Sequence, residues 1–185
     1  MIDVRYRLLG YTGGVIVPNT LCETDLIKGD CLGRSPWLLV DQDMIDSFGT
    51  ATRDVEPLHM DPEWCLDNSP YGKPIAYGFQ TMSLLTHLFH TATGGLFSGG
   101  EATQDFPLNY GFNNLRLLSP VTVGSEIQGT FILSDMEQRN SGELLVTVAA
   151  TISIKGKAKP ALIADWLMMW VTDEGRQSVM RATHA

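Results

Sequence analysis

The amino-acid sequence predicts an α+β domain in which a long antiparallel sheet wraps around a central buried helix. Two observations support this prediction: one long apolar segment with helical character at residues 75–95, and four strand-like segments between residues 109 and 171. A single sheet has an apolar face that must be covered, so the simplest packing sets the helix against that face.

Composition indicates one globular domain that binds no nucleic acid. The chain has 185 residues, of which 44% are hydrophobic and 18% charged, and such a length buries about two-thirds of the unfolded surface, enough for a dry pocket. The formal net charge of −8 argues against general contact with phosphates, which needs a basic surface.

The N-terminal twenty residues contain glycines and Pro18, which interrupt any signal-peptide core or membrane span. We therefore expect a cytoplasmic protein with no membrane partner. The three cysteines form no C-x-x-C pair, so neither a disulfide framework nor a zinc site is expected.

A strand at WLLV, residues 37–40, is followed by signals for two helices. Asp41 is a candidate N-cap for residues 41–52, where apolar side chains recur at helical spacing. Asp61, Pro62 and an acidic first turn begin a second short helix. The stretch between these helices, residues 53–60, is predicted to be a loop.

The segment at residues 75–95 has apolar side chains on most sides of a helix, and Gly94-Gly95 provides its C-terminal stop. We expect this helix to be buried nearly all round. His87 and His90 lie on it at i and i+3, but without an acidic or cysteine partner they are not expected to bind a metal.

The C-terminal half has four strand-like segments: NYGFNNLRLLSPV, SEIQGTFILSDMEQ, ELLVTVAATISIKG and PALIADWLMMWV. The first of these begins at Asn109. Apolar and polar residues partly alternate in the second, and Asn140-Ser141-Gly142 is typical of a hairpin tip. These segments supply the long antiparallel sheet.

The loop RDVEPLHMDP, residues 53–62, has the groups needed for proton transfer. Asp54 and His59 are five residues apart with a rigid proline between them, and such a pair can converge on one water molecule. An isolated Asp-His pair is, however, more often a capped turn. The residues of this loop alone leave both interpretations open.

Gly78, at the start of the apolar helix, is a second candidate. Backbone N–H groups at a helix N-terminus carry partial positive charge and can polarise a carbonyl oxygen, and glycine permits close approach. Tight packing of the helix start explains a glycine equally well.

Residues 45–85 resemble the MaoC-like (R)-specific enoyl-CoA hydratases, and most closely their nodulation protein N branch. The family motif reads Gly-Asp-x-Asn-Pro-Leu-His, then Asp-Pro, then Ile-x-His-Gly; this chain has RDVEPLH, DP and IAYG in that order. The later run NYGFNNLRLLSPVTVGSEIQG resembles the strand and Pro-Val-x-x-Gly turn of the same family.

The resemblance implies a hotdog fold and a homodimer or higher homo-oligomer formed through the sheets. It implies that Asp54 and His59 are the catalytic pair that activates water, and that the Gly78 N–H binds the thioester carbonyl. The implied reaction is reversible hydration of a trans-2-enoyl thioester to an (R)-3-hydroxyacyl thioester. No metal or redox cofactor is implied, because coenzyme A or phosphopantetheine enters as part of the substrate.

Three residues depart from the family motif and are candidate modulators of the site. Arg53 replaces its glycine, Glu56 its asparagine and Tyr77 the histidine before Gly78. Arg53 and Glu56 can pair with each other or act on Asp54, since a cation favours a carboxylate and a second carboxylate disfavours it. Two alternatives to a hydratase therefore stay open: a non-catalytic acyl-thioester binding protein and a hotdog acyl-CoA thioesterase.

The organisation of the chain also suggests domain limits. We expect residues 1–35 to form an N-terminal extension or cover segment, residues 36–174 the hotdog domain, and residues 175–185 a C-terminal tail.

Overall fold

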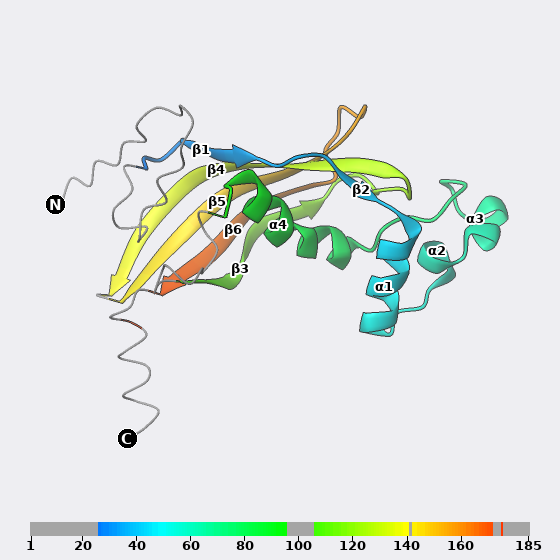
Figure 1. Ribbon diagram of the computed structural model, residues 1–185, viewed down its shortest axis with the longest axis horizontal. Coiled ribbons are helices and arrows are strands. Elements are labelled where there is room, and N and C mark those ends of the chain that lie inside the picture. The colour runs from blue at the N-terminus through cyan, green and yellow to red at the C-terminus, as the bar shows by residue number, and fades with distance from the viewer. Residues whose placement is uncertain (1–25, 96–105, 141, 172–174, 176–185) are drawn as a thin grey trace, which may run out of the picture.

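The computed structural model describes residues 26–95, 106–140, 142–171 and 175. Its antiparallel sheet has six strands: β1 (Cys31–Arg34), β2 (Leu38–Val40), β3 (Phe106–Leu117), β4 (Ser125–Asn140), β5 (Glu143–Ile154) and β6 (Leu162–Val171). Its four helices are α1 (Gln42–Thr52), α2 (Pro57–Met60), α3 (Pro62–Asn68) and α4 (Gly78–Ala92). Figure 1 shows the sheet curving around α4.

The strands follow the order β1-β4-β5-β6-β3, with β2 pairing to β4 beside β1. The predicted hairpin is confirmed, because Asn140 at the end of β4 pairs with Glu143 at the start of β5. Along β5 and β6 the side chains alternate between buried and half-buried positions, as expected for a sheet with one covered face. Strand β3 forms the edge opposite β1 and β2.

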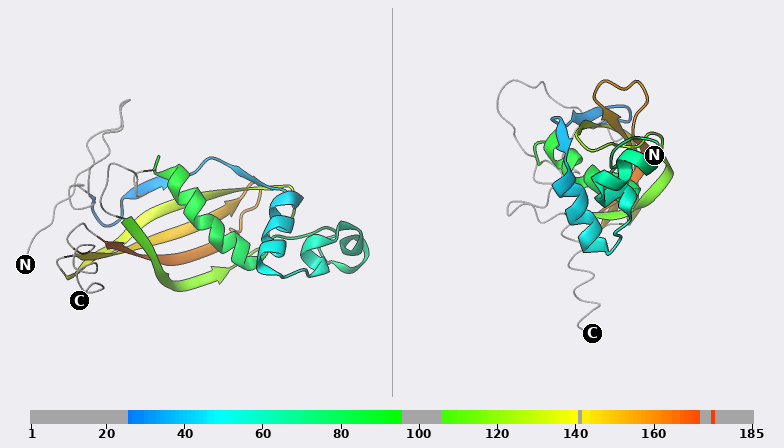
Figure 2. Two further views of the ribbon diagram at one scale, coloured as in Figure 1. Left: turned by 60° about the horizontal axis from the view of Figure 1, so that its bottom comes forward. Right: turned by 90° about the vertical axis from the view of Figure 1, so that its right-hand side faces the viewer.

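Helix α4 lies across the concave face of the sheet (Figure 2). Its Phe89 ring packs edge-on against Phe131 of β4 at 5.0 Å and against Trp166 of β6 at 5.5 Å between ring centroids. One long antiparallel sheet around a single helix is the predicted hotdog fold, which is therefore confirmed.

The prediction that this helix is buried nearly all round is wrong for the single chain. Phe79 is 72% exposed, and Ser83, Thr86, His87 and His90 are exposed as well. The sheet covers only one side of α4, so its opposite face is left to solvent.

Helices α1, α2 and α3 extend beyond one end of the sheet (Figure 1). Both predicted N-caps are confirmed: the Asp41 carboxylate accepts from the Met44 N–H at 2.9 Å, and the Asp61 carboxylate from the Trp64 N–H at 2.8 Å. The predicted loop between α1 and α3 differs, because it contains the short helix α2 with Pro57 in its first turn.

The sheet begins inside the predicted N-terminal cover segment. Strand β1 pairs with residues 130–132 of β4, so residues 31–34 belong to the sheet. Residues 1–25 of that segment, and residues 176–185 of the predicted tail, lie outside the described residues. Within the described part of the chain, no helix is long and apolar enough to cross a membrane.

Candidate active site

Asp54 follows the left-handed end of α1. Arg53 has φ 61° and ψ 25° and caps the helix, its N–H pointing back at the carbonyls of Gly49 and Thr50. The next N–H, of Asp54, donates to the Gly49 carbonyl at 3.0 Å. The helix end therefore fixes the Asp54 backbone while its side chain stays exposed.

His59 lies in the last turn of α2 and is half-buried. Its Nδ1 is 2.6 Å from the carbonyl oxygen of Ile75. A carbonyl can only accept, so Nδ1 carries the hydrogen, and in the neutral imidazole the lone pair is on Nε2. The neutral imidazole can therefore accept a proton only at Nε2.

Tyr77 connects the two candidate catalytic residues. Its hydroxyl donates to the backbone carbonyl of Asp54 at 2.5 Å, and its ring centroid lies 3.8 Å from that of His59 with 31° between the planes. Tyr77 is only 3% exposed and is the N-cap residue of α4, directly before Gly78. One side chain thus brings the loop of Asp54 and His59 to the start of α4.

Gly78 is the first residue of α4, where backbone N–H groups lack intrahelical acceptors. A Cβ built on Gly78 would lie 2.6 Å from Cδ1 of Leu117 on β3, so a side chain here would have to displace Leu117. The absence of a Cβ leaves the helix start accessible beside β3.

The remaining two motif departures lie at the surface. Arg53 and Glu56 are exposed, and neither forms an ion pair with any residue that the structure describes. The ion pair between Arg53 and Glu56 that the sequence suggested is therefore not formed.

The pKa of Tyr77 is raised by burial and then by the negative charges of Asp54, Asp46 and Glu56. The raised pKa keeps the hydroxyl protonated and able to donate a hydrogen bond.

A pocket of about 300 Å³ lies between α4, β3 and β6. It is lined by Thr86, Phe89, His90, Pro107, Asn109, Trp166 and Met168. The Trp166 indole N–H donates to the Asn109 side-chain oxygen at 3.1 Å, which leaves a largely apolar wall. Phe89 of this pocket lies eleven residues, or about three turns, after Gly78, which places the two residues on nearly the same side of α4.

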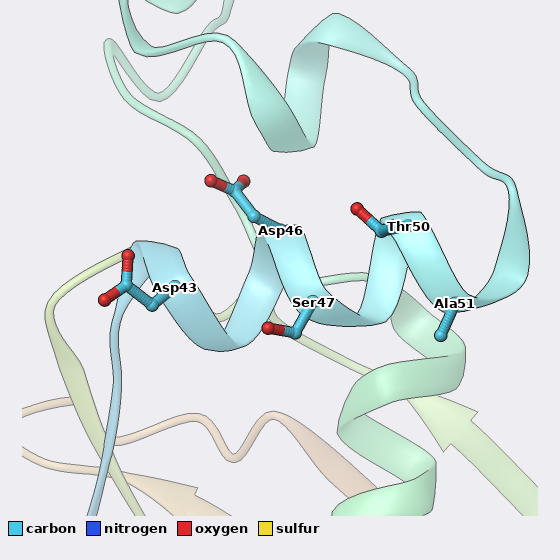
Figure 3. Close-up of a pocket in the computed structure, with 5 residues that line it drawn as sticks. All are labelled: Asp43, Asp46, Ser47, Thr50 and Ala51. Carbon is cyan, nitrogen blue, oxygen red and sulfur yellow. The ribbon is translucent and has the colours of Figure 1, made fainter.

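A second hollow runs along α1 (Figure 3). It is lined by Asp43, Asp46, Ser47, Thr50 and Ala51, all from this one helix. Neither Asp54 nor His59 lines it, so it is separate from the candidate site.

His87 and His90 are both exposed on α4. Across the described residues, no group of three or more His, Cys, Asp or Glu side chains is placed to hold a metal ion.

Comparison with known proteins identifies the family. The family model of the MaoC-like domain matches residues 27–154 of the sequence, which is more than half of the chain. The chain belongs to the MaoC-like family.

Named relatives of this MaoC-like chain agree with that assignment. "Nodulation protein N" of Rhizobium meliloti is 37% identical over 150 residues, covering 80% of this chain and 89% of the relative. "3-hydroxyacyl-thioester dehydratase Z" of Mycobacterium tuberculosis is 34% identical over 146 residues, covering 77% and 90%. The solved (R)-hydratase of A. caviae shares the fold, with a TM-score of 0.61, 20% identity and coverage of 80% and 97%.

Several residues that support this MaoC-like site were not predicted from the sequence. Gln42 donates to the His59 carbonyl at 2.9 Å, and Gln80 donates to the Met44 carbonyl at 2.9 Å. Of these residues, only Gly49 could have been predicted from the sequence. Glycine inside a helix costs about 1 kcal/mol relative to alanine, so its presence there suggests a close contact. A Cβ on Gly49 would collide with the Tyr77 hydroxyl and lie 2.8 Å from the Asp54 carbonyl oxygen.

Proposed function

We propose that this protein is a hydro-lyase that reversibly adds water to a trans-2-enoyl thioester to give an (R)-3-hydroxyacyl thioester. Asp54 and His59 activate the water, and the N–H at the start of α4 binds the thioester carbonyl. The family and the relative described as a 3-hydroxyacyl-thioester dehydratase support this proposal.

The observation that carries the proposal is the contact between His59 and Ile75. With the hydrogen on Nδ1 held by the Ile75 carbonyl, the Nε2 lone pair is available to accept a proton from water. The Asp54 carboxylate is exposed, and we propose that it accepts a hydrogen bond from the same water. The pair takes one proton from the water as its oxygen bonds to C3, and that proton is then delivered to C2, so both groups end in the protonation state in which they began.

Negative charge collects on the thioester oxygen as water attacks C3. A preorganised N–H at Gly78 stabilises this charge more in the transition state than in the substrate, and so lowers the barrier. These groups supply the whole reaction, so we propose that no separate cofactor takes part and that coenzyme A or phosphopantetheine arrives with the substrate. We also propose a cytoplasmic location, which cell fractionation would test.

The acyl chain is proposed to run along α4 into the pocket beside Phe89. Eleven residues separate Gly78 from Phe89, which corresponds to about 16 Å along a helix. Strand β3 follows the same path, since Leu117 is next to Gly78 and Asn109 lines the pocket. This length suits a medium or long acyl group.

We propose a homodimer formed through the β3 edge. The strand exposes Leu108, Tyr110 and Leu117, and Phe79 of α4 is exposed next to Gly78. Pairing with a second β3 would cover these apolar side chains and the free strand edge. Light scattering should find a dimer that Tyr110→Asp converts to a monomer, whereas Leu66→Asp on exposed α3 should leave it intact; a monomeric wild type would contradict the proposal.

The function is tested with crotonyl-CoA, longer trans-2-enoyl-CoAs and the matching carrier-protein thioesters. Loss of enoyl absorbance without release of free thiol supports hydration. Thiol release would instead indicate a thioesterase, and binding without turnover a non-catalytic protein. Chiral analysis of the product should give the (R)-3-hydroxyacyl thioester.

The catalytic pair is tested by Asp54→Asn and His59→Ala. Each should lower kcat by about 10²- to 10⁴-fold, the usual contribution of general acid-base catalysis. Asp43→Asn and His87→Ala are matched controls, because both residues are exposed and lie outside the site. Full activity in either site variant would overturn the assignment.

A further inference from the structure

Tyr77 has three separate attachments to the candidate site. Its hydroxyl donates to the Asp54 carbonyl, its ring packs against the His59 ring at a tilt of 31°, and its own carbonyl accepts from the N–H and the hydroxyl of Thr81 in the first turn of α4. Its position is therefore set by α4.

The hydroxyl has a definite acceptor in a confined space. A buried phenol must hydrogen-bond, because an unsatisfied buried donor costs free energy. The hydroxyl makes this bond beside Gly49, where a Cβ would collide with it. Phe48 packs on the other side, with ring centroids 5.3 Å apart. The local structure thus accommodates the whole tyrosine side chain, including its oxygen.

The attachments act on the two catalytic candidates in different ways. The Tyr77 hydroxyl holds the Asp54 carbonyl, and the Gly49 carbonyl holds the Asp54 N–H. These two hydrogen bonds fix the Asp54 backbone and so limit where its carboxylate can lie. The ring stops the His59 imidazole from turning about its bond to Ile75 and so sets the direction of Nε2. Loose positioning of such groups is costly, because proton transfer needs hydrogen-bond reach.

We propose that Tyr77 is a positioning residue, which holds Asp54 and His59 in fixed relation to the N–H of Gly78. The role rests on the proposed hydratase function. It is distinct from the catalytic roles, since the Tyr77 hydroxyl is engaged by the protein's own backbone. Tyr77 therefore retains the site geometry at a position where the family motif has histidine.

Two variants separate the hydroxyl from the ring. Tyr77→Phe keeps the ring and removes the donor, and it should lower kcat about tenfold, the worth of one hydrogen bond, with KM within about twofold. Tyr77→Leu removes the ring and should lower kcat further. Tyr71→Phe is the matched control on an exposed tyrosine before α4, and it should retain wild-type kcat. Circular dichroism melting checks that each variant is folded.

Imidazole nitrogen NMR of the full ¹⁵N-labelled chain supplies a readout that does not depend on turnover. The His59 signal, identified by its loss in His59→Ala, should report a hydrogen on Nδ1 in the wild type and in Tyr77→Phe. In Tyr77→Leu it should shift toward a mixture of tautomers.

The outcomes separate this inference from the proposed function. Unchanged kcat in both folded variants, or an unchanged His59 signal in Tyr77→Leu, would overturn the positioning role even if the wild type hydrates enoyl thioesters. If the wild type hydrates none, the proposed function fails. The nitrogen signal then decides alone whether Tyr77 holds His59.

Discussion

The hydroxyl of Tyr77 occupies the space where a side chain on Gly49 would begin. Gly49 is buried in α1, which ends just before Asp54, and Tyr77 begins α4. The helix that leads to Asp54 and the helix that begins at Gly78 are thus in close contact because Gly49 has no side chain.

Helix propensity and side-chain packing predict opposite effects of Gly49→Ala on stability. Propensity alone would make Gly49→Ala more stable by about 1 kcal/mol. The new Cβ would instead meet the Tyr77 hydroxyl and lie 2.7 Å from the Met60 sulfur, so we expect lower unfolding free energy in urea and lower hydration activity. Ser47→Ala, exposed on the same helix, is the control and should lose neither; a stabilised, active Gly49→Ala would refute the contact.

The left-handed backbone conformation of Arg53 predicts that glycine at this position stabilises the protein. Its φ of 61° is unfavourable for a residue with a Cβ, and glycine removes that cost at the price of a more flexible unfolded chain. Arg53→Gly should therefore raise the unfolding free energy by about 0.5–1 kcal/mol. Activity should be unchanged, because the side chain is exposed and unpaired with any described residue. Ala51→Gly, inside the helix, should be destabilising under the same urea titration.

Gly78→Ala should abolish most hydration activity without unfolding the protein. The added Cβ meets the exposed end of Leu117, which can move, but it also narrows the approach to the helix N–H groups. Adding Leu117→Ala relieves only the first effect. Steady-state kinetics of the single and double variants decide between them: recovery of kcat in the double variant would show that packing, not access, was the cause.

The pH dependence of stability follows from the raised pKa of Tyr77. Folding holds the Tyr77 proton more tightly than the unfolded chain does, so the contribution of Tyr77 is full below pH about 10 and falls as pH rises further. Tyr77→Phe lacks this titration. We therefore expect the difference in unfolding free energy between the wild type and Tyr77→Phe to be constant from pH 8 to about 10 in urea titrations. Between pH about 10 and 11 this difference should become smaller, by at most about 1.4 kcal/mol per pH unit. A difference that widens would contradict the direction of the shift.

The pocket beside Phe89 predicts chain-length selection. Thr86→Phe should fill part of the pocket of about 300 Å³, so kcat/KM for trans-2-dodecenoyl-CoA should fall while that for crotonyl-CoA is retained. Ser83→Phe is the matched control, since Ser83 is exposed on α4 and does not line the pocket. Equal losses for both substrates in Thr86→Phe would place the acyl chain elsewhere.

Local signals predicted much of the fold. Asp41 and Asp61 cap helices because their side chains bond within three residues, and the C-terminal strands carry their own alternation. Strand β1 was missed because its pairing partner is about a hundred residues away. The exposed face of α4 was predicted wrongly, since an apolar helix does not reveal how many of its faces a sheet covers.

The candidate site was predicted from residues in a recognisable order, and its catalytic role stays a prediction. Asp54, His59 and Gly78 came from such a motif, and Tyr77 was noted only as a departure from it. Ile75 contributes a carbonyl and Gly49 contributes empty space. Neither function depends on a characteristic side chain, so a sequence pattern cannot reveal them.

Four hydrogen bonds around the site share one feature, which is that a side chain donates and a backbone carbonyl accepts. The donors are Gln42, His59, Tyr77 and Gln80, and the acceptors belong to His59, Ile75, Asp54 and Met44. Every amino acid brings the same carbonyl, so mutation at Ile75 or Met44 retains the acceptor. The donors therefore constrain the sequence through their side chains, whereas these two accepting positions can vary while the hydrogen bonds are kept.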